Sequence, residues 1–216
     1  KNKGGETSFE SGADLARNNF FSTDEKQDTL QFKSLSAKYD LKTQLILCNA
    51  VDYIQVGDAR IYPDSSRVRI RKAAAMDSLK NAVIVANYIT KYHTFKDAQV
   101  KISSRKYYEG TAKYPYYDRD SNLTILPMNS IKFVNLTTTA QGEVKEKDRF
   151  KLSKEFDYYG SVVDKASNQG LFLNGSTRLN HTCQYDKSWM TFEDTVLATN
   201  IQIPIRATPK NAKGDR

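Results

Sequence analysis

The stretch FDYYGSVVDKASNQGLFLNG, residues 156–175, carries the strongest fold signal in this chain. Aromatic and β-branched residues run to position 165, as is typical of a strand. Asn168-Gln169-Gly170 has the composition of a turn, and Leu171 begins a second apolar run. The stretch therefore predicts a β-hairpin. Gly160 and Gly175 are expected to mark a bulge or a close approach of neighbouring backbone.

The same strand pattern recurs through most of the chain. Alternating apolar and polar residues predict half-buried strands, and short apolar runs predict strands buried on both faces. The alternating segments are Arg67–Arg71, Gln99–Ile102 and Ile201–Ile205, and the short runs are Leu45–Leu47 and Leu171–Leu173. Polar turn residues separate these segments. We therefore predict a mainly β fold, in which stacked hairpins form a sandwich, a jellyroll or an open groove, with at most one or two short helices.

The segment Ser78–Tyr92 allows two interpretations. Its apolar residues would fall on one helical face, but it also contains the β-branched run Val83-Ile84-Val85, which favours a strand. We favour the strand and leave the helix as the alternative.

Composition shifts predict three parts. Residues 1–28 are polar and weakly periodic and are expected to form a linker or loosely held arm, with at most a short helix near residues 13–16. Residues 29–206 are expected to form one β-rich domain, and residues 207–216 a polar tail. The chain begins at Lys1 without an apolar signal region, so we expect a mature form or a piece of a longer protein.

The charge balance favours anionic partners. The 216 residues include 33 Lys and Arg against 25 Asp and Glu, for a net charge of +8. No basic run and no known nucleic-acid-binding motif accompanies this charge, so nucleic acid is not the expected partner. No apolar stretch is long enough for a transmembrane helix. Cys48 and Cys183 are compatible with one long-range disulfide or with two buried thiols.

No group of residues predicts catalysis, a metal or a cofactor. His93 and His181 lack further ligands at metal-binding spacing, and the cysteines lie in no catalytic motif. The stretch DRDSN (118–122) resembles the start of a calcium loop, but Leu123 replaces the required glycine and Asn129 the required acid. A polar hairpin tip is the better interpretation. We expect a non-enzymatic protein.

Two groups are candidate ligand-binding residues. Arg67, Arg69 and Arg71 would share one strand face, where they could bind anionic groups or prevent edge-to-edge pairing. The stretch KYYEGTAKYPYYDRD supplies five tyrosines that could stack on sugar rings or pack as cross-strand pairs. These are Tyr107, Tyr108, Tyr114, Tyr116 and Tyr117.

Two resemblances refine the expected function. The run from VGDARIYPDSS to KYYEG, with FDYYGSVV and LFLNGSTRLNHTC, resembles a region of long uncharacterised exported β-rich proteins of Bacteroidetes-type bacteria. Ala37-Lys38-Tyr39-Asp40 and Tyr159-Gly160-Ser161-Val162 are similar to the stacked repeats of the OstA-like lipopolysaccharide-transport family. That resemblance implies an open jellyroll groove for acyl chains and a periplasmic or outer-membrane-associated protein. The segment 105–150 departs from the repeat spacing.

We therefore expect a structural or ligand-binding domain of a larger cell-envelope chain, in contact with neighbouring segments of that chain. In the groove interpretation an apolar interior would hold an amphipathic envelope molecule such as lipopolysaccharide, and the three arginines would meet its headgroup. The residues expected to line that interior are Val68, Ile70, Val83, Val85, Val100 and Ile102. The alternative is a carbohydrate-binding or adhesion module that uses the tyrosines.

Overall fold

A computed structural model describes residues 7–10, 18–182, 188–203, 208 and 210–211. The fold is mainly β, as predicted. Within the described residues, helical structure is limited to four single 3-10 turns: η1 (Glu25–Gln27), η2 (Asp64–Ser66), η3 (Lys72–Ala74) and η4 (Glu146–Asp148). No helix in this part of the chain is long and apolar enough to cross a membrane.

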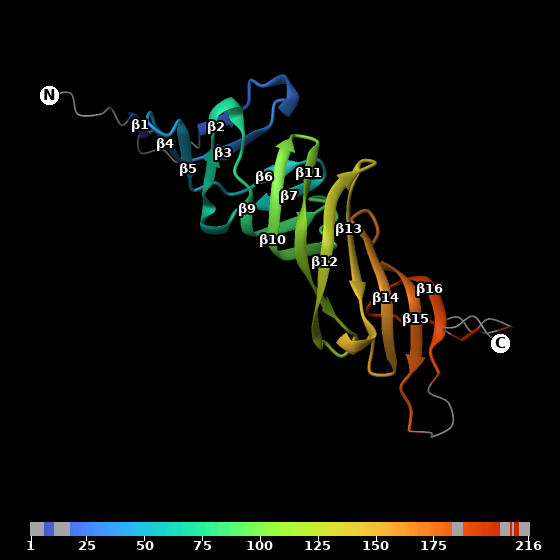
Figure 1. The fold of residues 1–216 in the computed structure, drawn as a ribbon. Helices are drawn as coiled ribbons and strands as arrows, with labels where there is room; N and C mark the ends of the chain where they lie inside the picture. The colour runs from blue at the N-terminus through green and yellow to red at the C-terminus, as the bar shows by residue number, and fades with distance from the viewer. Residues whose placement is uncertain (1–6, 11–17, 183–187, 204–207, 209, 212–216) are drawn as a thin grey trace.

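Twelve strands form one antiparallel sheet that extends along the long axis of the molecule (Figure 1). Their order is β16-β15-β14-β13-β12-β11-β10-β9-β7-β6-β3-β2, so from β9 onward each strand pairs with its neighbour in sequence. The strands are β2 (Asn18–Phe21), β3 (Gln31–Ser34), β6 (Ile54–Val56), β7 (Ala59–Tyr62), β9 (Leu79–Ala86), β10 (His93–Ser104), β11 (Tyr107–Tyr117), β12 (Leu123–Val134), β13 (Thr137–Val144), β14 (Phe156–Lys165), β15 (Leu171–Leu179) and β16 (Met190–Val196).

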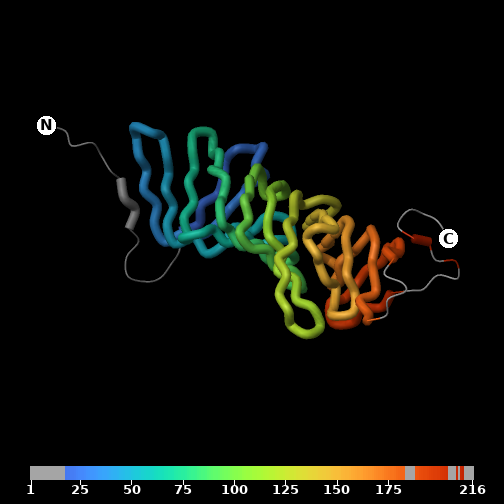
Figure 2. The backbone as a smooth tube through the Cα atoms, turned by 60° about the horizontal axis from the view of Figure 1, so that its bottom comes forward, coloured from blue at the N-terminus to red at the C-terminus, as the bar shows by residue number. Residues whose placement is uncertain are grey.

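A second sheet of four strands lies at the N-terminal end, in the order β1-β4-β5-β8. It consists of β1 (Thr7–Glu10), β4 (Ser36–Asp40), β5 (Leu45–Asn49) and β8 (Val68–Ile70). The chain alternates between the two sheets up to β9, and Figure 2 shows the β4–β5 hairpin standing beside the segment that contains β8. This alternation places apolar side chains of both sheets opposite one another.

The predicted hairpin at 156–175 is confirmed as β14–β15. Gly160 and Gly175 lie directly opposite each other in its register. A Cβ atom on Gly175 would lie 2.2 Å from the carbonyl oxygen of Tyr159 and 2.7 Å from the Cα atom of Gly160. Gly160 also has a φ of +142°, which L side chains rarely adopt. The two glycines therefore permit the close backbone approach that the sequence predicted.

The main sheet curves strongly around its apolar interior. β10 carries register shifts near Asp97, a non-glycine residue with positive φ. The two ends of β10 approach the same β6–β7 turn: Gly57 N donates to the Arg105 carbonyl after β10, and Tyr88 N, before β10, donates to the Asp58 carbonyl. The curvature closes the interior, which is filled by one continuous cluster of buried side chains.

Several local predictions are decided by the structure. Ser78–Tyr92 contains strand β9 and no helix, so the favoured interpretation is correct. Within the expected loose arm, Thr7–Glu10 and Asn18–Phe21 form strands, because β1 pairs with β4 and β2 pairs with β3. The short helix expected near residues 13–16 lies outside the described residues. Ile201–Ile203 is not in a strand.

Candidate functional site

An apolar trough opens where the two sheets diverge at the N-terminal end. The main sheet supplies Phe20 and Phe21 of β2 and Phe32 of β3, and the small sheet supplies Ile46 of β5 and Ile70 of β8. Leu30, in the loop before β3, also lines the trough. Met76 and Ala74, which follow β8, complete the apolar wall, and the cavity has a volume of about 220 Å³. This N-terminal trough is the best candidate for a binding site.

The shape of the trough follows from strand register. Phe20 and Phe32 are cross-strand partners, and their rings stack at a centroid distance of 5.7 Å. One end is closed by Gln27, whose Nε2 donates to the Ala74 carbonyl across 2.9 Å. Phe21 is 65% exposed although it lines the trough. The site therefore exposes apolar surface that the protein's own residues leave uncovered.

One cation lies at the rim. Arg71 lines the trough and forms a two-point ion pair with Asp77, with nitrogen–oxygen distances of 2.5 and 3.0 Å. The hydrogen bonds to Asp77 raise the pKa of Arg71, so its charge is permanent. Arg67 and Arg69 are exposed but do not line the trough. Of the three predicted arginines, the structure brings only Arg71 to this site. Arg69 lies on β8, the last strand of the small sheet, where charge also opposes further strand pairing.

The predicted apolar lining is largely wrong. Val68, Val100 and Ile102 are buried in the packed core, so they face no open groove. Val83 and Val85 are half-buried on the other face of β9, because Ala82, Ile84 and Ala86 take the core positions. A bulge at Asn81, which has positive φ, sets this register, and the sequence pattern did not reveal it. Only Ile70 was correctly placed at an accessible apolar surface.

The five tyrosines do not form one platform. Tyr108 and Tyr116 are buried, and their hydroxyl groups bond to Thr138 Oγ1 at 2.7 Å and to the Leu152 carbonyl at 2.8 Å. Burial raises the pKa of both. They are core residues, since successive side chains of a strand alternate between its two faces. The prediction of a ligand surface is therefore corrected for Tyr108, whereas Tyr116, although buried, borders the cavity that Tyr114 and Tyr117 line.

The other three tyrosines occupy different surroundings. Tyr107 and Tyr117 are exposed at opposite ends of β11, and Tyr114 is half-buried. Tyr114 and Tyr117 line a second cavity of about 270 Å³ together with Tyr92, Thr94 and Gln169. We refer to this as the tyrosine cleft. Tyr92 was not among the predicted residues, because it lies at a turn distant in sequence.

A polar cluster is buried behind the tyrosine cleft. His93 Nε2 lies 2.7 Å from the carbonyl oxygen of Asn168, so this nitrogen carries a hydrogen and donates. His93 Nδ1 lies 3.1 Å from the hydroxyl of Tyr114 and 3.2 Å from Oδ2 of Asp164. Burial lowers the pKa of His93 and raises the pKa of Asp164 well above its ordinary value. Both pKa shifts favour the uncharged forms of the pair, in which Nδ1 accepts a hydrogen bond from the Tyr114 hydroxyl.

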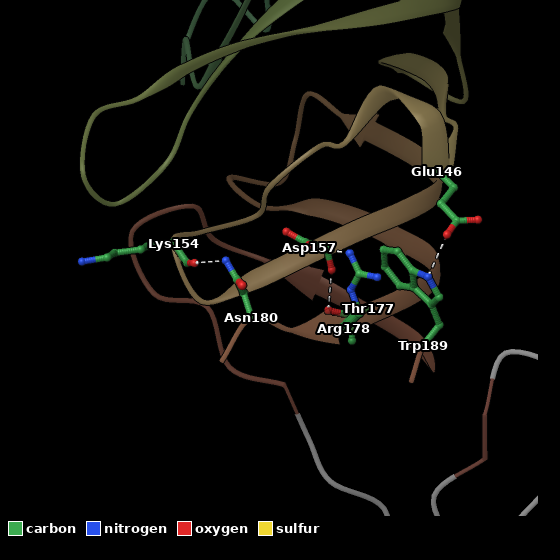
Figure 3. A network of polar contacts seen from close by, with 7 residues as sticks. All are labelled: Glu146, Lys154, Asp157, Thr177, Arg178, Asn180 and Trp189. Atoms are coloured by element: carbon green, nitrogen blue, oxygen red, sulfur yellow. Dashed lines mark hydrogen bonds and ion pairs between the residues drawn. The ribbon is translucent and has the colours of Figure 1, made fainter. Parts of the chain in front are cut away.

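A second polar network occupies the C-terminal end of the sheet (Figure 3). Trp189 Nε1 donates to Glu146 at 3.0 Å, and Arg178 donates to Asp157 at 2.7 Å. The guanidinium of Arg178 lies 4.4 Å from the centre of the Trp189 ring, and Tyr159 meets that ring edge-on at 4.6 Å. The Trp189 indole is thus already in contact with Glu146, Arg178 and Tyr159 of the protein itself. We interpret the network as a clamp that holds β16 to β14 and β15.

The remaining polar motif is structural. In the 118–122 turn, the Asp118 carboxylate accepts hydrogen bonds from Asp120 N at 2.9 Å and Asn122 N at 2.8 Å, as in a polar hairpin tip. Across the described ranges, no group of three or more His, Cys, Asp or Glu side chains could hold a metal. Cys48 is a free, buried thiol, and Cys183 lies outside the described residues.

Comparisons with known proteins add no relative: no family model, curated protein or solved structure matches the chain. The fold and its sites thus define the class only as a mainly β protein in which a curved antiparallel sheet and a smaller sheet enclose an apolar trough.

Proposed function

We propose that the protein binds an acyl chain that bears an anionic headgroup, in the N-terminal trough. The observation that supports this proposal is the aromatic lining of the trough beside the cation of Arg71, in which Phe21 is exposed, Phe20 half-buried and Phe32 buried. Covering apolar surface of this kind lowers the free energy, and the small cavity of about 220 Å³ suits an unbranched chain better than a bulky ring system. The proposal retains the groove interpretation but confines the groove to one end of the molecule.

Arg71 gives the site its preference for an anionic headgroup. Its guanidinium is exposed, and Asp77 holds its orientation. A carboxylate or phosphate at the mouth of the trough would meet free donors of that guanidinium, while its chain followed the aromatic wall. The positive charge of the whole protein adds a favourable field for the approach of such a ligand.

The test is the binding of a fluorescent fatty acid to the delipidated protein. Phe21→Asp should lower the affinity about tenfold or more, because a charged group replaces a ring that the chain would cover. Leu41→Asp is the matched control: Leu41 is 61% exposed, close to the 65% of Phe21, but lies outside the trough. Absence of saturable binding, or equal effects of the two substitutions, would refute the proposal.

A carbohydrate-binding function remains the second candidate, supported by the tyrosine cleft. Tyr92 and Tyr117 are both exposed at its mouth, and Gln169 supplies an amide beside them. Aromatic rings with a neighbouring amide suit a sugar, because the ring faces stack and the amide bonds to hydroxyl groups. Joint replacement of Tyr92 and Tyr117 by alanine should abolish retention on polysaccharide gels. Tyr107→Ala is the control, since Tyr107 is exposed but lies at the other end of β11.

A further inference from the structure

The turns that meet where the curved sheet closes form a rigid cluster. Gly57 and Asp58, in the β6–β7 turn, are at its centre. Gly57 N donates to the Arg105 carbonyl of the β10–β11 turn at 2.9 Å, and Tyr88 N, in the β9–β10 turn, donates to the Asp58 carbonyl at 2.8 Å. The Asp58 carboxylate accepts from Thr138 N, at the start of β13, at 2.9 Å. We call these three turns and the β12–β13 turn, which precedes Thr138, the turn cluster.

Packing reinforces this network. A Cβ atom on Gly57 would lie 2.5 Å from the ring of Phe133, so Phe133 near the end of β12 covers the glycine closely. The turn cluster surrounds a cleft of about 680 Å³. Because four separate turns are tied to one another by backbone and side-chain contacts, the surface around this cleft is held in one arrangement.

Two aliphatic side chains project from this rigid surface. Leu136 is 86% exposed and Ile89 is 76% exposed, and both line the cleft. The hydrogen bonds from Ile89 N and Thr90 N to the Asn87 side chain, at 3.1 and 3.2 Å, fix the turn that carries Ile89. These apolar groups are therefore presented to solvent by an ordered framework.

Leu136 is also conformationally unfavourable. Asn135 and Leu136 connect β12 to β13 in a two-residue turn, with φ values of +51° and +65°. Such a turn favours glycine at its second position, where a leucine side chain is strained. Because Leu136 is exposed at a position that suits glycine, the stability of the fold does not explain why a leucine is there. It is therefore a candidate for a role in recognition.

Cations accompany the two aliphatic groups. Arg105 and Lys106 line the same cleft, and Lys91 is exposed in the turn that carries Ile89. Lys106 is paired with Asp28 at 3.1 Å. The carboxylate of Asp58 faces the turn backbone and is satisfied internally. In the part of the chain that the structure describes, the side chains of Arg105 and Lys91 have no ion-pair partner, so they are free to meet anions.

We propose that the turn cluster docks on an anionic lipid bilayer, with Ile89 and Leu136 inserted among the headgroups and Arg105 and Lys91 against lipid phosphates. Isolated aliphatic tips flanked by cations suit an interfacial layer, in which apolar groups are buried shallowly and positive charges remain at the phosphates. A flat protein partner would instead match a continuous apolar patch. This proposal does not depend on the N-terminal trough.

The test is sedimentation with phosphatidylcholine vesicles, with and without about one-third phosphatidylglycerol. The protein should bind the anionic vesicles and bind the neutral ones weakly. Leu136→Gly should reduce partitioning at least fivefold yet leave the melting temperature unchanged or higher, because glycine relieves the strained turn. A structural role for the leucine would instead lower the melting temperature. Leu41→Gly, at an exposed turn away from the cluster, should leave partitioning unchanged.

Further measurements separate the possible sources of binding. Arg105→Gln should weaken partitioning into anionic vesicles about fivefold, as expected for one cation at a charged surface. Leu136→Gly, which lies outside the trough, should leave fatty-acid binding unchanged, so the two proposals fail independently. Displacement from vesicles by millimolar inorganic phosphate would show a soluble-anion site and overturn the proposal. Failure to bind anionic vesicles at low salt would also overturn it.

Discussion

Replacing Asp164 by asparagine should change how the stability of the protein depends on pH. Asp164 is buried beside His93, and neither of its carboxyl oxygens forms a hydrogen bond with the described residues. The raised pKa of Asp164 and the lowered pKa of His93 both favour the uncharged forms in the folded state. The folded pair thus holds one proton, on Asp164, in addition to the hydrogen on His93 Nε2.

The sign follows from counting protons. In the unfolded chain the pair also holds one such proton between the ordinary aspartate pKa of 3.8 and the ordinary histidine pKa of 6.5, and none above 6.5. Between pH 3.8 and pH 6.5 the folded and unfolded states therefore hold the same number of protons at this pair, so the pair does not change wild-type stability with pH. Above pH 6.5 only the folded state holds the proton, so wild-type stability falls as the pH rises. In Asp164→Asn only His93 titrates. Its lowered pKa makes the variant lose stability as the pH falls below 6.5, with no change above.

The difference between the two proteins isolates Asp164. Relative to wild type, the variant should gain about 1.4 kcal/mol of unfolding free energy for each pH unit. The gain accumulates from the ordinary aspartate pKa of 3.8 up to the raised pKa of the folded carboxyl.

Urea unfolding, followed by fluorescence at several pH values, measures this difference. The imidazole resonances of His93 should also titrate below the ordinary histidine pKa of 6.5 in the folded wild type. A difference in unfolding free energy that is independent of pH would refute the reasoning, because it would mean that the folded carboxyl has an ordinary affinity for protons.

Three further outcomes are expected. Gly175→Ala should destabilise the protein by about 2–4 kcal/mol, since its Cβ would lie 2.2 Å from a backbone oxygen, whereas Asn174→Ala, exposed on the same strand, should be nearly neutral in the same urea unfolding assay. Tyr108→Phe should cost about 1–2 kcal/mol in thermal or urea unfolding, because the buried threonine that its hydroxyl contacts at 2.7 Å loses a partner. In a Cys183→Ser background, Cys48 should react with a thiol reagent at mildly alkaline pH only on unfolding, because burial raises its pKa to about 11; rapid labelling of the folded protein would contradict this.

The hairpin at 156–175 shows what local pattern can predict. Its strands, its turn and its paired glycines were all readable, because a two-strand unit is set by neighbours in sequence. Strand β9 shows the limit. The sequence favoured a strand, but not which face would be buried, since the bulge at Asn81 depends on pairing with β10. The burial of Tyr108 and Tyr116 could not be predicted for the same reason, because it depends on how the sheet curves.

The candidate sites could be predicted even less well from the sequence, because their residues come together only in the tertiary structure. The trough combines β2 and β3 with β5 and β8, and only the alternation of the chain between two sheets brings these strands together. Arg71 was identifiable from sequence as a candidate, but Phe21 lay in a segment predicted to be a loose arm. The partnership of His93 with Asp164 joins residues 71 positions apart, and no periodicity connects them.

The sequence alone thus determined the mainly β class and the clearest hairpin, and it favoured the strand at β9, because alternation and turn chemistry act between residues close in the chain. Tertiary structure decided the curvature of the sheet, the face that each strand buries, and the residues that meet at the trough, the tyrosine cleft and the turn cluster. These features depend on which strands pair and how far the sheet bends, and both are set by contacts between residues distant in sequence.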